Sequence, residues 1–202
     1  MRYKQKQIPI TSEEYHTLEI YKDWYYISGL SVHSITEEMS IIAVKASGCA
    51  LKFIPMPYRK EPICDIAVTS TWSAMEFVPV SLRTEKLSRK AITQRDCTLE
   101  FIPDIYKTKE FCNLALCFSG YAIKGMPKQL ITEDICYKVI SYNSFILGSI
   151  PEELKTYKLC EFAIKKNGYS IIYTPTYMID NNLKNIAKSQ NLNKWFIDNV
   201  IK

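Results

Sequence analysis

Histidine and glycine are scarce in this chain of 202 residues, and their scarcity excludes several kinds of site. The two histidines, His16 and His33, have no partner at a metal-ligand spacing such as H-E-x-x-H. The six glycines are scattered, so the sequence contains no glycine-rich loop that would hold a phosphate group. We therefore expect no metal, no cofactor and no catalytic residues, and we interpret the protein as non-enzymatic.

Long apolar runs are also absent. No stretch of about 18 apolar residues occurs, so the sequence predicts no membrane-spanning helix and no membrane partner. The basic N-terminal segment is not followed by a hydrophobic stretch, and we expect no secretory signal. The net charge is only +5, and lysines alternate with glutamates, which argues against nucleic acid as a partner. These features favour a cytoplasmic protein.

Six of the nine prolines, in contrast, are spaced with complete regularity. Successive members of one set lie 24 residues apart, namely Pro55, Pro79, Pro103, Pro127, Pro151 and Pro175. Residues 34–177 form six 24-residue repeats, and worn copies at 10–33 and 178–202 are interpreted as N- and C-terminal caps. We therefore predict a single repeat domain over residues 1–202, in which Met1–Pro9 forms a basic lead-in.

The repeat register also interprets the cysteines, of which the chain has seven and no C-x-x-C pair. Cys64, Cys112, Cys136 and Cys160 occupy one column, where other repeats carry Ser40 and Ser88. A column that alternates Cys with Ser indicates a small, packed side chain rather than a ligand. Neighbours one repeat apart would lie too far from each other for a disulfide, so we expect free, structural cysteines.

Each repeat predicts one clear helix of about ten residues. A threonine begins it, as at Thr36, Thr84 and Thr156, and satisfies an orphan backbone N–H as an N-cap. A column of alanines inside this helix predicts close approach between helices. Gly48, Gly120 and Gly168 are expected to end the helix with a positive φ angle.

The second segment of each repeat is ambiguous. Residues such as Ala50–Ile54 precede the repeat proline, which excludes helical backbone at the residue before it. The segment fits a short helix, and the chain is then an all-α solenoid of short helix pairs with a 24-residue period. It also fits a strand, which predicts a leucine-rich-repeat-like α/β solenoid, although the repeats lack the asparagine and the full leucine ladder.

The repeat as a whole resembles a known one. Leu154–Glu161 (LKTYKLCE), Ala163–Gly168 (AIKKNG) and Ile150–Glu153 (IPEE) are similar to the phrase L-K-T-E-x-L-C-x-x-A-V-K-x-N-G-x-A-L-x-Y-V-P-E-E of bacterial DUF4116-type repeats. The resemblance covers nearly the whole chain. It implies an α-helical repeat protein from a secreted-effector or toxin–immunity setting, and it implies no catalytic residues.

Positions that break the repeat are the candidates for binding. Aromatic residues appear at outward positions of repeats four and five, at Phe118 and Tyr142, while the aromatic column of the second segment shrinks to Gly125 and Ser149. One interpretation is an exposed binding patch, and the other is repacking in which these aromatic rings fill the gaps. The predicted partner-binding residues are Phe118, Tyr121, Tyr142, Phe145 and Trp72.

A second candidate surface is basic. It comprises Arg83, Lys86, Arg89, Lys90 and Arg95 of repeat three. Acidic neighbours such as Glu85 and Glu100 favour a solvated mixed face over an anion site.

These features predict a protein that binds another protein. The most concrete hypothesis is an immunity-type inhibitor that blocks a cognate toxin domain. A translocated effector that acts as an adaptor on a host target is the second hypothesis, and an enzyme whose site leaves no sequence pattern is the third.

Overall fold

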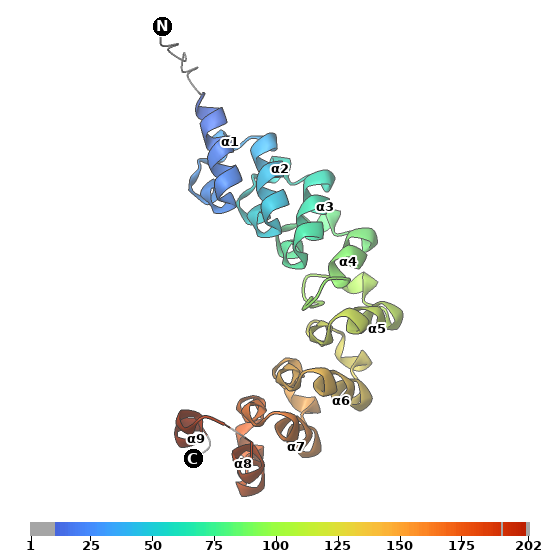
Figure 1. Cartoon of the computed structure of the whole chain (residues 1–202). Helices are drawn as coiled ribbons and strands as arrows, with labels where there is room; N and C mark the ends of the chain where they lie inside the picture. The colour runs from blue at the N-terminus through green and yellow to red at the C-terminus, as the bar shows by residue number, and fades with distance from the viewer. Residues whose placement is uncertain (1–10, 191, 201–202) are drawn as a thin grey trace. The chain divides into compact units, whose positions relative to one another are not determined.

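The computed structural model describes residues 11–190 and 192–200, and it divides into two compact units, residues 1–91 and 92–202. Each unit is built from repeated groups of one α-helix and shorter 3₁₀ helices (Figure 1). The predicted lead-in, Met1–Pro9, lies outside the described residues. No α-helix of the described part is long and apolar enough to cross a membrane.

In the first unit, three α-helices lie side by side and a fourth ends at the boundary. These are α1 (Ser12–Lys22), α2 (Glu37–Ala46), α3 (Glu61–Ser70) and α4 (Glu85–Ile92) (Figure 1). Each of the first three is followed by a six-residue 3₁₀ helix, η1 (Trp24–Gly29), η3 (Gly48–Phe53) or η5 (Trp72–Phe77). A three-residue 3₁₀ turn then leads into the next repeat, at η2 (Val32–Ser34), η4 (Met56–Tyr58) and η6 (Val80–Leu82).

The second unit repeats the same succession. Its α-helices are α5 (Lys109–Phe118), α6 (Glu133–Tyr142), α7 (Tyr157–Lys166), α8 (Asn181–Lys188) and α9 (Lys194–Val200). The first three are followed by η8 (Gly120–Ile123), η10 (Ser144–Ser149) and η12 (Gly168–Tyr173). The short turns that precede α5 to α8 are η7 (Asp104–Tyr106), η9 (Lys128–Leu130), η11 (Glu152–Leu154) and η13 (Thr176–Met178). In this unit α6 packs against α7, and α7 packs against α8.

The threonine caps are present as predicted. Thr36, Thr108 and Thr156 each accept a hydrogen bond through Oγ1 from the backbone N–H three residues later, at 3.2–3.3 Å. At α1 the cap is reciprocal, because Thr11 N donates to Glu14 Oε2 at 2.8 Å and Glu14 N donates to Thr11 Oγ1 at 3.2 Å. These bonds satisfy N–H groups that the first helical turn leaves without intrahelical partners.

The second segment of the repeat is helical, so the all-α class is confirmed. Gly48–Phe53 and its equivalents form 3₁₀ helices, and residues 11–190 and 192–200 contain no strand. The leucine-rich-repeat-like alternative is therefore wrong. The physical reason is local, because the backbone of this segment forms i→i+3 hydrogen bonds with itself, such as Ala50 N to Ser47 O at 3.0 Å, instead of hydrogen bonds to a neighbouring strand. The solenoid arrangement of the whole chain remains a prediction.

The repeat proline both ends one element and begins another. The residue before it is extended, as at Ile54 with φ −72° and ψ 132°, because the proline ring excludes helical backbone there. The carbonyl of Pro55 then accepts from Tyr58 N at 2.9 Å and starts the short turn η4. A proline therefore fits where the backbone changes direction between repeats.

The glycine column has a different role from the predicted one. The helix ends instead at an extended residue such as Ser47, with φ −153°, and Gly48, Gly120 and Gly168 have no positive φ. A Cβ atom added at Gly48 would lie 2.1 Å from the carbonyl oxygen of Ala67 in the next repeat. Gly168 meets Ala187 in the same way, at 2.8 Å. At Gly48 and Gly168 the absence of a side chain allows close approach to the alanine column of the next repeat, whereas Trp72 and Ser144 occupy the equivalent position elsewhere.

The Cys/Ser column is packed as predicted. Cys64, Cys112, Cys136 and Cys160 are buried and form no disulfide, and Ser40 and Ser88 are fully buried at the equivalent positions. Ser40 Oγ donates to the Thr36 carbonyl at 2.8 Å. Ser88 Oγ has no hydrogen-bond partner among the described residues, so this column carries one unsatisfied hydroxyl.

A basic column that the sequence reasoning missed ties the 3₁₀ helices together. Arg59 donates to the carbonyls of Ile54 and Lys52 in its own repeat and to that of Phe77 in the next, at 2.8–3.1 Å. Lys155, only 5% exposed, occupies the same column and donates to the carbonyl of Tyr173 at 3.1 Å. These charge-assisted bonds satisfy carbonyls at the ends of adjacent 3₁₀ helices.

The C-terminal copy covers the last apolar face. Phe196 of α9 is buried in a cluster with Ile171, Leu183 and other residues of the last two repeats. Its ring packs edge-on against Tyr169, with ring centroids 4.6 Å apart. This arrangement fits the predicted role of a cap, because the exposed face of a final repeat needs an atypical cover.

The glycine–alanine contact predicts a position-specific response to one methyl group. We expect Gly48→Ala to lower the free energy of unfolding by about 3 kcal/mol, because the Ala67 carbonyl lies within the space that the methyl needs. Gly29→Ala is the matched control, since nothing lies within 4 Å of its added Cβ, and it should change stability by less than about 0.5 kcal/mol. Urea unfolding measures both, and equal effects would contradict the contact.

The unsatisfied hydroxyl gives a second prediction. Ser88→Cys should raise the free energy of unfolding by about 1 kcal/mol, because the thiol is cheaper to bury without a partner than the hydroxyl. Ser40→Cys, in which a bonded hydroxyl is lost, should be neutral or destabilising. Thermal unfolding of the two variants compares them, and a fall in stability for Ser88→Cys alone would show that its hydroxyl is bonded.

Candidate functional site

The candidate site lies between the last turns of α5 and α6 in the second unit. The inner face of α5 buries Phe111, Cys112, Ala115 and Leu116, and that of α6 buries Cys136, Val139 and Ile140. The helical period then turns the final residue of each helix away from the core. Phe118 is 47% exposed and Tyr142 is 73% exposed.

These two aromatic residues line one surface groove of about 420 Å³. Lys138, one turn before Tyr142, and Cys117 also line it, and Ser119 and Gly120 form part of the lining at the end of α5. The equivalent residues in other repeats are small or polar, such as Ala46, Ser70 and Lys166. The aromatic groove is therefore a local departure from the repeat.

Backbone caps hold both ends of the groove. Ser119 and Asn143 follow α5 and α6 as extended residues, and each accepts a hydrogen bond from the backbone N–H two residues later. Asn143 Nδ2 also donates to the Tyr121 hydroxyl at 3.0 Å. Gly120 lets the next repeat approach closely, since an added Cβ would lie 2.5 Å from Ile146 Cδ1. The site therefore rests on ordered elements rather than on a loop.

The predicted site residues are only partly brought together. Phe118 and Tyr142 share the groove, but Tyr121 and Phe145 lie on the following 3₁₀ helices, η8 and η10. Tyr121 is half-buried and hydrogen-bonds to Asn143, while Phe145 packs edge-on against Tyr173 at 6.2 Å. Trp72 begins η5 in the first unit, where it is half-buried, and is not part of this groove.

The expectation that Gly125 opens internal space is wrong. Gly125 has a φ of +83°, and an added Cβ there would lie 2.4 Å from Glu100 N and 2.5 Å from the carbonyl carbon of Leu99. The backbone of the preceding repeat fills this space, because residues 93–103 form turns rather than a 3₁₀ helix, and Leu99 N donates to Lys124 O at 2.8 Å. The exposed ring of Phe118 is therefore not needed to fill a gap.

In the fifth repeat the predicted opening is at Ser149, which is half-buried and follows Gly148. Tyr173 of the next repeat lies against Gly148, with ring atoms 2.7–3.2 Å from an added Cβ. Tyr142, at 73% exposed, points into solvent rather than inward. Of the two interpretations of the aromatic residues, the geometry favours the exposed patch over compensated repacking.

Three members of the basic set of repeat three have partners within the protein. Arg83 donates to the carbonyls of Val78 and Glu76, and Arg89 pairs with Glu85 at 2.8 Å. Lys90 Nζ lies 2.5 Å from Asp65 Oδ1 of the preceding repeat. The guanidinium of Arg83 therefore has a structural role through its bonds to backbone carbonyls, and the two ion pairs balance the charges of Arg89 and Lys90.

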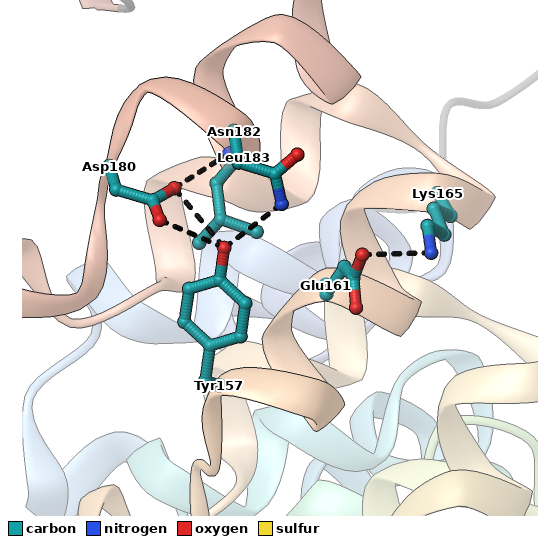
Figure 2. Close-up of polar contacts among 6 residues, drawn as sticks. All are labelled: Tyr157, Glu161, Lys165, Asp180, Asn182 and Leu183. Atoms are coloured by element: carbon teal, nitrogen blue, oxygen red, sulfur yellow. Dashed lines mark hydrogen bonds and ion pairs between the residues drawn. The ribbon is translucent and has the colours of Figure 1, made fainter.

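Another polar cluster stabilises the N-terminal end of α8. The Tyr157 hydroxyl contacts the Asp180 carboxylate at 3.0 Å and accepts from Asn182 Nδ2 at 3.0 Å (Figure 2). Asp180 caps α8 by accepting from Leu183 N at 2.8 Å, and this bond, with the one from Tyr157, lowers the pKa of the carboxyl. Figure 2 also shows the Glu161–Lys165 ion pair one turn apart on α7. The cluster joins α7 to the cap of α8.

One hydroxyl–imidazole pair lies on α1. Ser12 Oγ lies 3.3 Å from His16 Nε2 on α1, but His16 Nδ1 faces the Tyr26 hydroxyl at 3.0 Å rather than a carboxylate. A nucleophile–base pair is normally oriented by a third, acidic group. Among the described residues, no three His, Cys, Asp or Glu side chains are grouped as metal ligands either.

Comparisons with known proteins add no relative. No family model matches the chain, and neither a curated protein nor a solved structure matches it significantly. The resemblance to DUF4116-type repeats therefore stays a prediction.

The groove contains residues that the sequence reasoning missed, namely Cys117 and Lys138. Cys117 is exposed, whereas Cys49 is half-buried and the other five cysteines are buried. Burial raises the pKa of the Cys64, Cys97 and Cys136 thiols to about 11. The reactive thiolate is therefore scarce at the buried positions.

Thiol reactivity tests the exposure of the groove. At pH 8, an aromatic disulfide reagent should react rapidly with about one thiol per chain, and Cys117→Ser should remove this phase. Cys49 should react more slowly, since its Sγ lies 3.7 Å from Ser73 Oγ, and the buried thiols should react only in denaturant. A rapid phase that persists in Cys117→Ser would contradict the described surface.

Proposed function

We propose that this chain is a non-enzymatic protein-binding repeat protein, and that its partner docks at the groove lined by Phe118, Lys138 and Tyr142. The observation that carries the proposal is the exposure of two aromatic rings in one groove, at equivalent positions of adjacent repeats. Aromatic side chains bury a large area at a small cost in conformational entropy, and they dominate the energetics of many interfaces.

The rigid setting of the groove supports the same proposal. Both rings stand on α-helices whose opposite faces are buried, and Ser119 and Asn143 fix the following residues by accepting hydrogen bonds from the backbone N–H groups of Tyr121 and Phe145. A preorganised surface loses little freedom when a partner binds, so more of the contact energy appears as affinity. Surface presentation of this kind is the usual mode of action of repeat proteins.

The specific form that we propose is an immunity-type inhibitor that blocks a cognate toxin domain by covering it. The resemblance to repeats from toxin–immunity settings supports this form. The net charge of +5 favours an acidic partner surface over a basic one, since complementary charges steer association. An adaptor that binds a host protein is the second candidate, and it would use the same groove.

Alanine substitutions test the groove with the protein encoded beside this chain's gene as the probe. Phe118→Ala and Tyr142→Ala should each weaken the complex at least about tenfold, because an interface anchor is lost. Tyr177→Ala is the matched control, as it removes another aromatic residue that is 79% exposed but lies outside the groove, and it should leave affinity within about twofold. Isothermal titration calorimetry measures all three.

Melting temperatures complete this test. Both groove variants should melt within a few degrees of the wild type, because the lost rings are exposed. A lower melting temperature with unchanged affinity would make the rings packing residues and contradict the proposed site. If the neighbouring protein forms no complex at all, the inhibitor form fails and the adaptor form remains.

A further inference from the structure

Long helices of neighbouring repeats meet at positions that lie 25 residues apart. Lys90 of α4 contacts both carboxylate oxygens of Asp65 of α3, at 2.5 and 2.6 Å. At the equivalent positions of α6 and α7, the rings of Tyr137 and Phe162 pack edge-on, with centroids 5.2 Å apart. The contact between these two columns thus recurs in both units, whether the pair is ionic or aromatic.

The groove carries an incomplete version of the ionic pair. Lys138 of α6 stands in the column of Lys90, but the column of Asp65 holds Asn113 on α5. Both Lys138 and Asn113 are exposed, and no carboxylate of the described residues pairs with Lys138. The groove therefore has a lysine at the position of Lys90, while the position of Asp65 holds a neutral amide of the same shape.

Lys138 and Asn113 both carry hydrogen-bond donors. Lys138 presents an ammonium group at the groove, Asn113 carries an amide NH₂ on α5, and each can donate to a carboxylate. The two aromatic rings line the same groove as Lys138, on the last turns of α5 and α6. The groove thus combines an apolar part with an unpaired positive charge.

We propose that the groove takes a segment of the partner protein in which an acidic residue neighbours an apolar one. The carboxylate of the segment pairs with Lys138, as Asp65 pairs with the equivalent Lys90 in the first unit. The apolar side chain of the segment lies between Phe118 and Tyr142. This inference rests on the proposed function, because it names the chemistry of the partner that docks there. Charge complementarity at one lysine selects the segment, and the rings supply most of the affinity.

The positive potential is testable without a partner, because Cys117 lines the same groove. Its reaction rate with the dianionic reagent 5,5′-dithiobis(2-nitrobenzoate), divided by its rate with neutral 4,4′-dithiodipyridine, reports the local potential. At low ionic strength Lys138→Gln should lower this ratio about two- to fivefold, and Asn113→Asp should lower it as much, because its carboxylate neutralises the lysine. Lys158→Gln, an equal charge change on α7, is the control. Equal ratios in wild type and Lys138→Gln would overturn the inference.

Defined peptides test the docking itself. Peptides of 12 residues selected from a random phage-displayed library on the full chain should carry an acidic residue next to an apolar one. Their dissociation constants, measured by fluorescence anisotropy, should rise about three- to tenfold for Lys138→Gln and for Asn113→Asp, and should be restored by Lys138→Arg.

The outcomes separate the two proposals. If the selected peptides lose affinity for Phe118→Ala and Tyr142→Ala but bind Lys138→Gln and Asn113→Asp as tightly as the wild type, the acidic-segment inference is overturned and the proposed function stands. If they bind the two alanine variants unchanged, the groove is not their docking site and the proposed function fails. Loss of affinity in both sets supports both proposals.

Discussion

The packing of adjacent repeats depends on close contacts at the start of the 3₁₀ helices. At Gly48 and Gly168 a side chain would collide with the carbonyl of Ala67 or Ala187 in the next α-helix, whereas Trp72 and Ser144 occupy the equivalent position of other repeats. Close-packed interiors transmit such a constraint directly, since a methyl group at Gly48 has no free space to occupy. The residue before this position is extended with or without a glycine, as at Ser47 and Thr71, and it turns the chain into the 3₁₀ helix.

The third repeat differs from the others at the start of its second segment. In the third repeat the glycine position holds Asp96, which has a φ of 59°, and residues 93–103 form turns in place of a 3₁₀ helix. The displaced backbone of Leu99 and Glu100 then occupies the space beside Gly125 in the fourth repeat. A change in one repeat is therefore accommodated by glycine in the next. The long helices are preserved throughout, so their outward positions are free to vary.

Sequence reasoning predicted the features that are decided within one repeat. The Thr156 cap and the packed Cys160 follow from local hydrogen bonding and helical period, and the exposure of Phe118 follows from the same period. The role of Gly48 and the carbonyl bonds of Arg59 depend on the next repeat, so a column read alone does not reveal them. Lys138 and Asn113 were missed for the same reason. Their significance appears only when a position in one repeat is compared with the position 25 residues later, in the next repeat.

In a repeat protein, charged and apolar side chains that have no partner in the neighbouring repeat indicate where another molecule binds. Some charged side chains of the described surface have internal partners: Lys90 has Asp65, and Lys165 has Glu161. The last apolar face is likewise covered by the C-terminal copy, as the burial of Phe196 against Ile171 and Leu183 shows. At the groove between α5 and α6, both kinds of complement are absent from the described residues, since the rings stand exposed and Lys138 has no carboxylate. In the proposed complex, a second protein would supply both complements at once, without altering the contacts that hold the repeats together.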